Sequence, residues 1–352
     1  MRAVVYHGPH DLRVSTVPDA TIEDPGDVIV ATTATSMCGS DLYLYQGEMP
    51  DLAVTGKTIL GHEIVGEVVG VGSGVTRFSE GDRVTFPFSV SCGTCSMCTL
   101  GLTGHCSTSG KAIYGFRELA GSHAEFVRVP MADGHLRSVP DVVDDAAAVL
   151  LSCNLPAAMI VVDAADVQRD DVVAVVGAGP TGLLALQLLT DRLERPPFVL
   201  DRVPHRLDRA ASLGGIPIDV ETDHVSQIIG EATHGAGVDA VVEFAGRGDA
   251  FDLATTILRP GGVFAGGGVY RVETAHPTSL GLLFANDLQM RLNGLANVLP
   301  EIDRAVQAIT ERSVDADSVF SHRIGLDEVP VAAEAFSRRD DGFHKMLVTL
   351  GS

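Results

Sequence analysis

The middle of the chain alternates between short apolar runs and segments of helical periodicity, and this pattern constrains the fold more than any other feature. The intervening segments Thr181–Arg192 and His205–Leu213 have helical character. The apolar runs are Val172–Val176, Phe198–Leu200, Ala240–Val242 and Val263–Ala265. Continuous runs of this kind are buried on both faces, as in a parallel sheet covered by helices. The alternation predicts a doubly wound α/β domain with a parallel sheet.

A glycine-rich turn connects the first apolar run to the first helix. It has the pattern G-x-G-x-x-G, made by Gly177, Gly179 and Gly182 with Pro180 and Thr181 between the last two glycines. The glycines let the backbone approach a pyrophosphate, and the N-terminus of the following helix favours its negative charge. The pattern alone is weak evidence, but its place between a strand and a helix predicts a Rossmann dinucleotide site.

The second apolar run ends in Asp201, nineteen residues after Gly182. A carboxylate at this spacing accepts hydrogen bonds from a ribose 2′-hydroxyl and repels a 2′-phosphate. The sequence therefore favours NAD over NADP. Arg202 and Arg206 lie close by in the sequence and are also predicted to contact the cofactor, although both could tolerate a phosphate.

The segments on either side of this domain have a different character. The first 140 residues or so contain short apolar strands and glycine-rich turns, for example at 27–31, 64–71 and 83–86. The tail after residue 297 holds a helical segment, 302–311, and a last strand, 345–350. Because such a tail is too short to form its own core, we expect one domain at 1–154 with 297–352, and a second at 155–296.

Composition excludes several classes of function. A formal charge of −21 opposes binding to nucleic acid or to an anionic membrane, because both require a basic surface. The basic residues include only three lysines, which is typical either of a high-salt cytoplasm or of a GC-rich genome. The sequence shows neither a signal peptide nor a stretch long enough to span a bilayer, so we expect a cytoplasmic protein.

Four cysteines lie within one short segment, residues 92–106. They are Cys92, Cys95, Cys98 and Cys106, in a C-x2-C-x2-C-x7-C spacing. Four thiolates can complete a tetrahedral zinc site, which leaves no position for substrate, so the predicted role is structural. Two disulfides and an iron–sulfur cluster are the alternatives. A reducing compartment disfavours the first, and the absence of a second cluster motif disfavours the other.

The remaining two cysteines, Cys38 and Cys153, are far apart, and His62 lies between them. Two thiolates, one imidazole and one vacant position make the ligand set expected of a catalytic zinc. Each residue alone has a simpler explanation, because a lone buried cysteine is usually an apolar filler. The three residues in this order, together with the four-cysteine segment and the dinucleotide motif, support the hypothesis of a catalytic zinc site.

Together these motifs resemble the zinc-containing medium-chain dehydrogenases, the alcohol dehydrogenase superfamily, over essentially the whole chain. The matching segments are GHEIVGEVVGVGSGV (61–75), GDRV (81–84), DRVPHRLDRAASLGG (201–215), GAGVDAVVEFAG (235–246), LRPGGVFAGGG (258–268) and FHKMLV (343–348). The resemblance implies a GroES-like catalytic domain followed by a Rossmann domain.

The resemblance also implies roles for single residues. Glu63 would lie behind the catalytic zinc as an alternative ligand, and Asp41 would orient His62. Ser40 would accept the substrate hydroxyl proton, and Lys345 would contact the cofactor pyrophosphate. Tyr43 stands where many relatives have a histidine in the proton relay, and tyrosine is a poor base near neutral pH. Ala157 stands where a threonine commonly packs against the nicotinamide.

The implied function is hydride transfer between NAD and a primary or secondary alcohol, or the corresponding aldehyde or ketone. The implied cofactors are NAD and two zinc ions per chain, one catalytic and one structural. A polyol, threonine or formaldehyde dehydrogenase of the same family and a non-catalytic NAD-binding homologue are the alternatives. The expected partners are a small-molecule substrate and copies of the same chain in a homotetramer or homodimer, paired edge to edge near Val263–Ala265.

Overall fold

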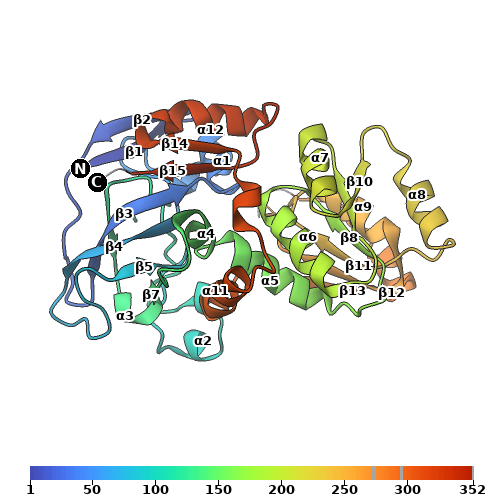
Figure 1. The fold of residues 1–352 in the computed structure, drawn as a ribbon, viewed down its shortest axis with the longest axis horizontal. Coiled ribbons are helices and arrows are strands. Elements are labelled where there is room, and N and C mark those ends of the chain that lie inside the picture. Colours follow the sequence, from blue (N-terminus) through green and yellow to red (C-terminus); the bar gives the residue numbers. More distant parts are fainter. Residues whose placement is uncertain (271–274, 294–295, 351–352) are drawn as a thin grey trace. The chain divides into compact units, whose positions relative to one another are not determined.

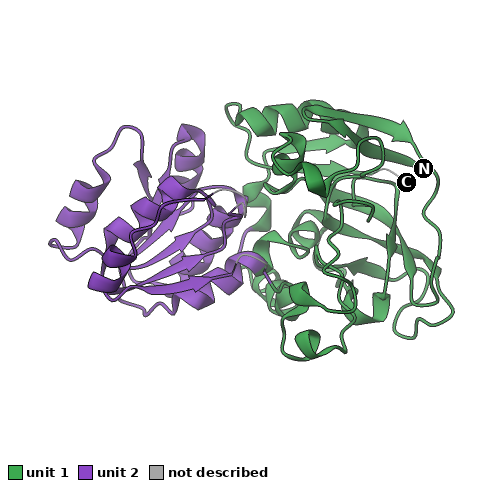
Figure 2. Cartoon of the chain, turned by 180° about the vertical axis from the view of Figure 1, so that it is seen from behind, with its two compact units in different colours: residues 1–156, 297–312, 316–352 green, residues 157–296, 313–315 purple. Residues whose placement is uncertain are grey.

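The computed structural model describes residues 1–270, 275–293 and 296–350, which form two compact units (Figure 1). Unit 1 contains residues 1–156, 297–312 and 316–352, and unit 2 contains residues 157–296 and 313–315 (Figure 2). Each unit has its own sheet and its own hydrophobic core.

The larger sheet of unit 1 joins strands from both ends of the chain. Its order is β14-β15-β3-β4-β5-β7, and β6 also pairs with β3. The strands are β3 (Val28–Ser36), β4 (Glu63–Val71), β5 (Arg83–Thr85), β6 (Phe126–Val129), β7 (Arg137–Ser138), β14 (His322–Gly325) and β15 (Met346–Thr349). Because β15 pairs antiparallel with β3, the C-terminal tail completes the sheet (Figure 1).

Two apolar clusters stabilise unit 1. In the first, Phe336 of helix α12 (Val329–Arg338) packs with Tyr6 of β1 (Arg2–Gly8) and with Met346. Strands β1 and β2 (Asp11–Thr16) form a short antiparallel hairpin that contributes to this cluster. The second cluster lies around Ile64 and Phe86. Each such fully buried side chain contributes about 1.5–3 kcal/mol through removal of apolar surface from water.

Unit 2 contains a six-stranded sheet in which every pair is parallel, in the order β10-β9-β8-β11-β12-β13. The strands are β8 (Val173–Val176), β9 (Phe198–Asp201), β10 (Ile216–Asp219), β11 (Val238–Glu243), β12 (Leu258–Gly266) and β13 (Gln289–Leu292). The connecting helices include α6 (Pro180–Arg192), α7 (Pro204–Ser212), α8 (Val225–Ala232) and α9 (Gly248–Ile257). The order reverses between β8 and β11, so the prediction of a doubly wound parallel sheet is confirmed.

Copies of the chain are predicted to pair edge to edge near Val263–Ala265, and this remains a prediction. Within one chain, β12, which contains this stretch, lies between β11 and β13. Phe264 and Ala265 are buried there, whereas Val263 is half-buried. The strand that ends this side of the sheet is β13, which is more polar and was not recognised from its sequence.

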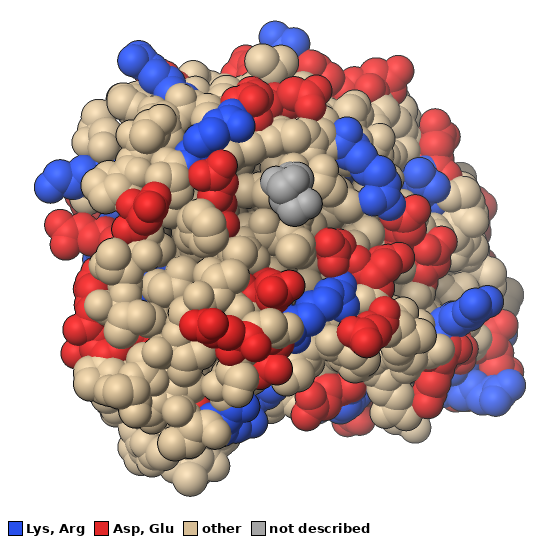
Figure 3. Space-filling model, turned by 60° about the vertical axis from the view of Figure 1, so that its left-hand side comes forward, with Lys and Arg blue, Asp and Glu red and all other residues tan. Residues whose placement is uncertain are grey.

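The part of the chain that the structure describes contains no helix long and apolar enough to cross a membrane. On the face drawn in Figure 3, arginine and lysine side chains lie singly or in small groups among acidic ones.

Candidate active site

The sheet of unit 1 brings the predicted ligands of the catalytic metal together. Ser36 at the end of β3 pairs with Glu63 at the start of β4, so Cys38 and His62 lie at the same end of two neighbouring strands. Ser152 hydrogen-bonds both backbone groups of Ile64, which holds Cys153 at this end as well. One donor atom from each of Cys38, His62, Glu63 and Cys153 lies within 4.8 Å of the others.

The orientation of His62 is determined by Asp41. The Asp41 carboxylate lies 3.1 Å from Nδ1 of His62 and accepts a 2.8 Å hydrogen bond from the backbone N–H of Cys38. Both side chains are buried, so this pairing selects the tautomer in which Nδ1 carries the proton. Nε2 is then left as the donor atom, and it lies 3.4 Å from Oγ of Ser40.

The two thiols of this cluster differ in acidity: the hydrogen bond with Cys38, together with burial, raises the pKa of the Cys153 thiol. A hydrogen bond from Cys153 lowers the pKa of the Cys38 thiol, with further help from His62. Burial opposes a charge on His62, but Asp41 and Cys38 outweigh it and raise its pKa. Two thiols, one imidazole and one carboxyl whose donor atoms lie within 4.8 Å of one another form a donor set of the kind that binds Zn²⁺.

Glu63 and Lys345 form a fully buried ion pair beside these donors. The Lys345 ammonium lies 2.7 Å from the Glu63 carboxylate and donates to the carbonyl of Met37 at 3.1 Å. Burial raises the pKa of Glu63 to about 7, against the attraction of Lys345. The predicted contact of Lys345 with a cofactor pyrophosphate remains a prediction.

Sequence reasoning missed two aromatic residues at this site. The rings of Phe88 and Phe116 lie 6.0 and 6.2 Å from the His62 ring. Both belong to irregular segments, where apolar residues follow no helical or strand period and therefore give no signal. Of the two predicted departures from the family pattern, Tyr43 lies in the short helix α1 (Asp41–Tyr45) and Ala157 lies in α5 (Asn154–Ala165).

The four-cysteine segment forms a second cluster of thiols. The sulfur atoms of Cys92, Cys95, Cys98 and Cys106 lie within 4.8 Å of one another, and Cys95 lies 3.5 Å from Cys98. A disulfide requires about 2.05 Å between sulfurs, and all six cysteines are free, so the alternative of two disulfides is wrong. The arrangement fits a tetrahedral metal with four thiolate ligands.

The glycine turn of unit 2 has the shape of a phosphate cradle. Gly177 follows β8 with φ +98°, and a Cβ on Gly182 would lie 1.9 Å from the carbonyl oxygen of Gly177. Helix α6 begins at Pro180, with Gly179 as its N-cap. Only glycine allows this close approach of the start of α6 to the turn, the arrangement found where a helix N-terminus binds a phosphate.

Asp201 is placed against that turn. Its carboxylate accepts hydrogen bonds from the backbone N–H groups of Ala178 at 2.7 Å, Arg202 at 2.7 Å and Val203 at 3.0 Å. The guanidinium of Arg206 lies 3.9 Å from the position of a Cβ built on Gly179. The structure thus brings together the glycine turn, Asp201 and Arg206, which are among the groups predicted to bind the cofactor. Of the other two, Arg202 directly follows Asp201, and Lys345 lies in unit 1.

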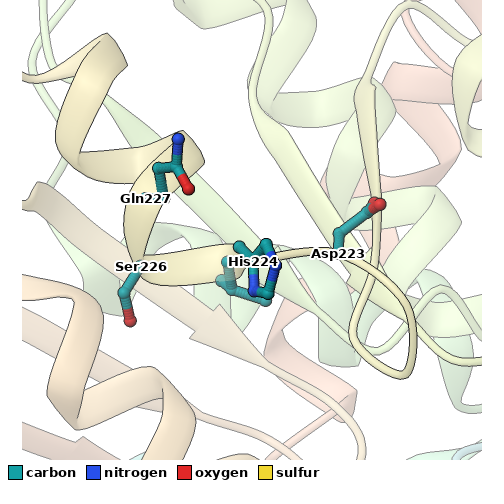
Figure 4. Close-up of a pocket in the computed structure, with 5 residues that line it drawn as sticks. Asp223, His224, Ser226 and Gln227 are labelled. Carbon is teal, nitrogen blue, oxygen red and sulfur yellow. The ribbon is translucent and has the colours of Figure 1, made fainter.

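A separate hollow lies at the start of α8 and is lined by residues 223–227 (Figure 4). The labelled side chains of Asp223, His224, Ser226 and Gln227 point in different directions. They therefore form no convergent set of catalytic groups.

Comparison with known proteins agrees with this fold and these clusters. Residues 24–141 match the alcohol dehydrogenase GroES-like domain, and residues 180–311 match the zinc-binding dehydrogenase family. Zinc-type alcohol dehydrogenase B of Aspergillus flavus is 36% identical over 281 residues, which cover 78% of this chain and 64% of that protein. The medium chain reductase/dehydrogenase ucsI of Acremonium sp is 37% identical over 271 residues, 74% of this chain and 91% of that protein.

A solved structure is similar over the full length. Alcohol dehydrogenase TADH from Thermus sp. ATN1 superposes with a TM-score of 0.91 at 34% identity, covering 100% of both chains. The fold and the thiol clusters define a two-domain zinc-type oxidoreductase with a GroES-like and a Rossmann domain. The chain belongs to the zinc-dependent medium-chain dehydrogenases, the alcohol dehydrogenase family.

Proposed function

We propose that the protein is an NAD-dependent zinc alcohol dehydrogenase that transfers hydride between NAD and a primary or secondary alcohol, or the corresponding aldehyde or ketone. The observation that carries this proposal is the convergence of Cys38, His62 and Cys153, with Glu63 beside them. These residues would hold Zn²⁺, and zinc lowers the pKa of a coordinated hydroxyl so that hydride can leave toward the nicotinamide.

The protein's own groups would then orient the ligands and move the proton. Asp41 holds His62 with Nε2 directed at the metal position. Ser40, which lies beside that nitrogen, accepts the substrate hydroxyl proton. Glu63 is kept in place by Lys345 and serves as the alternative ligand. Tyr43 is not expected to act as a base near neutral pH, so Ser40 would be the group of this chain that takes up the proton.

Zinc content tests the two metal sites separately. We expect two zinc ions per chain by mass spectrometry of the purified protein. Cys153→Ser should lose one ion together with turnover, because a catalytic ligand is removed. Cys98→Ser is the matched thiol-to-hydroxyl control at the four-cysteine segment and should lose the other ion. A Cys153→Ser protein that keeps both ions and full turnover would show that the third ligand is assigned wrongly.

The cofactor is proposed to be NAD rather than NADP because Asp201 is fixed against the glycine turn. A 2′-phosphate at this position would meet a carboxylate that already accepts three backbone hydrogen bonds. Arg202 and Arg206 carry positive charges that could bind a 2′-phosphate, and they therefore favour NADP. Fluorescence titration with NADH and NADPH decides between them, and tighter binding of NADPH would reject the proposal.

The choice of substrate is narrowed by the ring pair beside His62. Phe88 and Phe116 present apolar surface near the metal position, which favours an alcohol with an apolar carbon chain over a polyol or threonine. A substrate panel that follows NADH absorbance tests this, with formaldehyde included. A protein that binds NAD but turns over no alcohol or aldehyde would instead be a non-catalytic homologue. We further propose a reducing, cytoplasmic location, since all six thiols are free.

A further inference from the structure

A buried carboxylate lies at the end of the sheet where the cofactor is proposed to bind. Glu243 is the last residue of β11 and is fully buried. It pairs in register with Val176 of β8 and with Gly266 of β12, so it stands at the reversal of strand order. Doubly wound folds bind their ligands outside the carboxyl ends of the strands at this reversal.

The Glu243 carboxylate connects two loops that leave these strands. One oxygen accepts a 2.7 Å hydrogen bond from the backbone N–H of Gly246, and the other accepts one from the hydroxyl of Tyr270, also at 2.7 Å. The backbone of Ala245 lies against the glycine turn, since a Cβ on Gly177 would be 2.9 Å from its nitrogen. The segment that directly follows Glu243 therefore lies against the glycine turn of unit 2.

The hydrogen-bond donors to Glu243 are electrically neutral. Burial raises its pKa, whereas the Tyr270 hydroxyl and the N–H groups of Gly246 and Ala245 stabilise the ionised form and oppose that rise. The negative charge of the nearby Asp249 raises the pKa of Glu243 further. The hydrogen-bond donors stabilise a negative charge on this carboxylate, and the field of such a charge in a region of low dielectric acts more strongly than in water.

The two halves of the sheet receive different parts of a dinucleotide. The glycine turn and Asp201 belong to the half formed by β8, β9 and β10, which takes the adenosine. Glu243 begins the other half, β11, β12 and β13, which takes the nicotinamide nucleotide. The nicotinamide ring carries a positive charge when oxidised and none when reduced.

We propose that Glu243 is a charge-selecting residue of the cofactor site, which favours the oxidised over the reduced nicotinamide dinucleotide. Its buried negative charge attracts the cationic ring and has no equivalent attraction for the neutral one. The residue thereby shifts the equilibrium between the two bound cofactors. This inference rests on the proposed binding of NAD and adds a specificity that the glycine turn and Asp201 do not supply.

The test is the ratio of two dissociation constants, measured by calorimetry for NAD⁺ and by fluorescence for NADH on the zinc-loaded protein. Glu243→Gln keeps the size and a hydrogen-bond acceptor but removes the charge. We expect it to weaken NAD⁺ binding relative to NADH by roughly tenfold. Glu243→Met is a second neutral replacement, which provides the same comparison if the glutamine variant does not fold.

A charge-preserving variant is the matched control. Glu243→Asp shortens the side chain but leaves a carboxylate in place. It should change the two dissociation constants by similar factors. A ratio unchanged within twofold in Glu243→Gln, or shifted equally in Glu243→Asp, overturns the inference. If the wild-type protein binds neither NAD⁺ nor NADH, the proposed function itself is wrong.

Discussion

A single buried carboxylate, Asp41, connects two of the proposed zinc ligands through its contacts with His62 and the backbone of Cys38. Replacing it with asparagine places an amide opposite Nδ1 of His62 and disturbs the tautomer that leaves Nε2 free. Loss of such an outer partner typically weakens metal binding about 10- to 100-fold. We expect Asp41→Asn to release one zinc ion to a chelator faster by a comparable factor.

The control for this variant is Asp239→Asn in unit 2. Asp239 also accepts a backbone hydrogen bond, from Val172 at 2.8 Å, but lies in a different unit from the metal ligands. Its zinc release should match that of the wild type. Equal rates of zinc release in Asp41→Asn and the wild type would show that Asp41 does not support metal binding.

A second residue, His135, should make stability depend on pH. Burial lowers its pKa to about 4, and the ring hydrogen-bonds the Tyr114 hydroxyl at 2.9 Å. An unfolded chain protonates this histidine below about pH 6.5, so between pH 6.5 and 4 the unfolded state binds more protons and stability falls with falling pH. The loss is about 2 kcal/mol between pH 7.5 and 5.

Urea denaturation at these two pH values measures the effect. His135→Gln cannot titrate, so its free energy of unfolding should fall less than that of the wild type by about 2 kcal/mol. The variant is less stable at neutral pH, and the comparison therefore uses only the change with pH. Parallel pH dependence of the two proteins would contradict a neutral buried His135.

At the residue scale, the sequence predicted which donor types would meet but not all of their surroundings. Cysteine and histidine at these positions have few alternatives, and the structure brings the predicted set together. The burial of Lys345 could not be predicted, because ionisable side chains are rarely buried unless paired and its partner Glu63 is 282 residues away (345 − 63). Phe88 and Phe116 were missed because loop aromatics have no periodicity.

At the scale of elements, helix α6 must start close to the glycine turn, and this close approach can be tested. A Cβ on Gly182 would lie 1.9 Å from the Gly177 carbonyl oxygen, so Gly182→Ala must push the helix away from the turn. We expect the dissociation constant for NADH to rise at least about tenfold, because the helix N-terminus no longer points at the pyrophosphate. Zinc content should not change, since the ligands lie in unit 1.

Gly230→Ala is the matched control. Gly230 lies within helix α8, and a Cβ there meets nothing within 4 Å. Alanine is favoured over glycine inside a helix by roughly 0.5–1 kcal/mol, so this variant should be slightly more stable and bind NADH normally. NADH binding that survives in Gly182→Ala would show that the close approach is not required.

Elements with a strong period were the ones that could be predicted. The buried strands β8, β9 and β11 are continuous apolar runs, and helix α6 follows a glycine signal. The edge strands β10 and β13 were missed because they are partly exposed and contain polar residues or proline, which removes the apolar run. The preference of apolar residues for strands is weaker at an edge because fewer side chains are buried there.

At the scale of the whole molecule, the sequence predicted two folding units from the change in character near residue 150, and its net charge opposed binding to nucleic acid or to an anionic membrane. The sequence did not predict the identity of the substrate. Residues that face a substrate come from separate irregular segments, and only coordinates show which of them are close to His62. The charge of −21 describes the surface as a whole and therefore selects no single ligand.

We expect copies of the chain to meet at the exposed end of the unit 2 sheet. Helix α10 (Leu280–Ala285), which precedes the edge strand β13 in the chain, exposes Leu280 by 74% and Phe284 by 85%, and Leu292 at the end of β13 is 64% exposed. Exposed apolar side chains and an unpaired strand edge are unfavourable in water and typical of an interface. We therefore expect a homodimer or homotetramer in which copies pair through β13 and α10.

Light scattering on Phe284→Glu tests this assembly, because a charge at the centre of a self-complementary patch is repeated in both copies and repels itself. The variant should shift toward the monomer, and at low salt the shift should be larger because the repulsion is less screened. Val331→Glu alters an equally exposed residue, at 77%, on α12 in unit 1 and should keep the wild-type mass. A monomeric wild type would show that there is no such interface. Loss of assembly in Val331→Glu but not in Phe284→Glu would place the interface elsewhere.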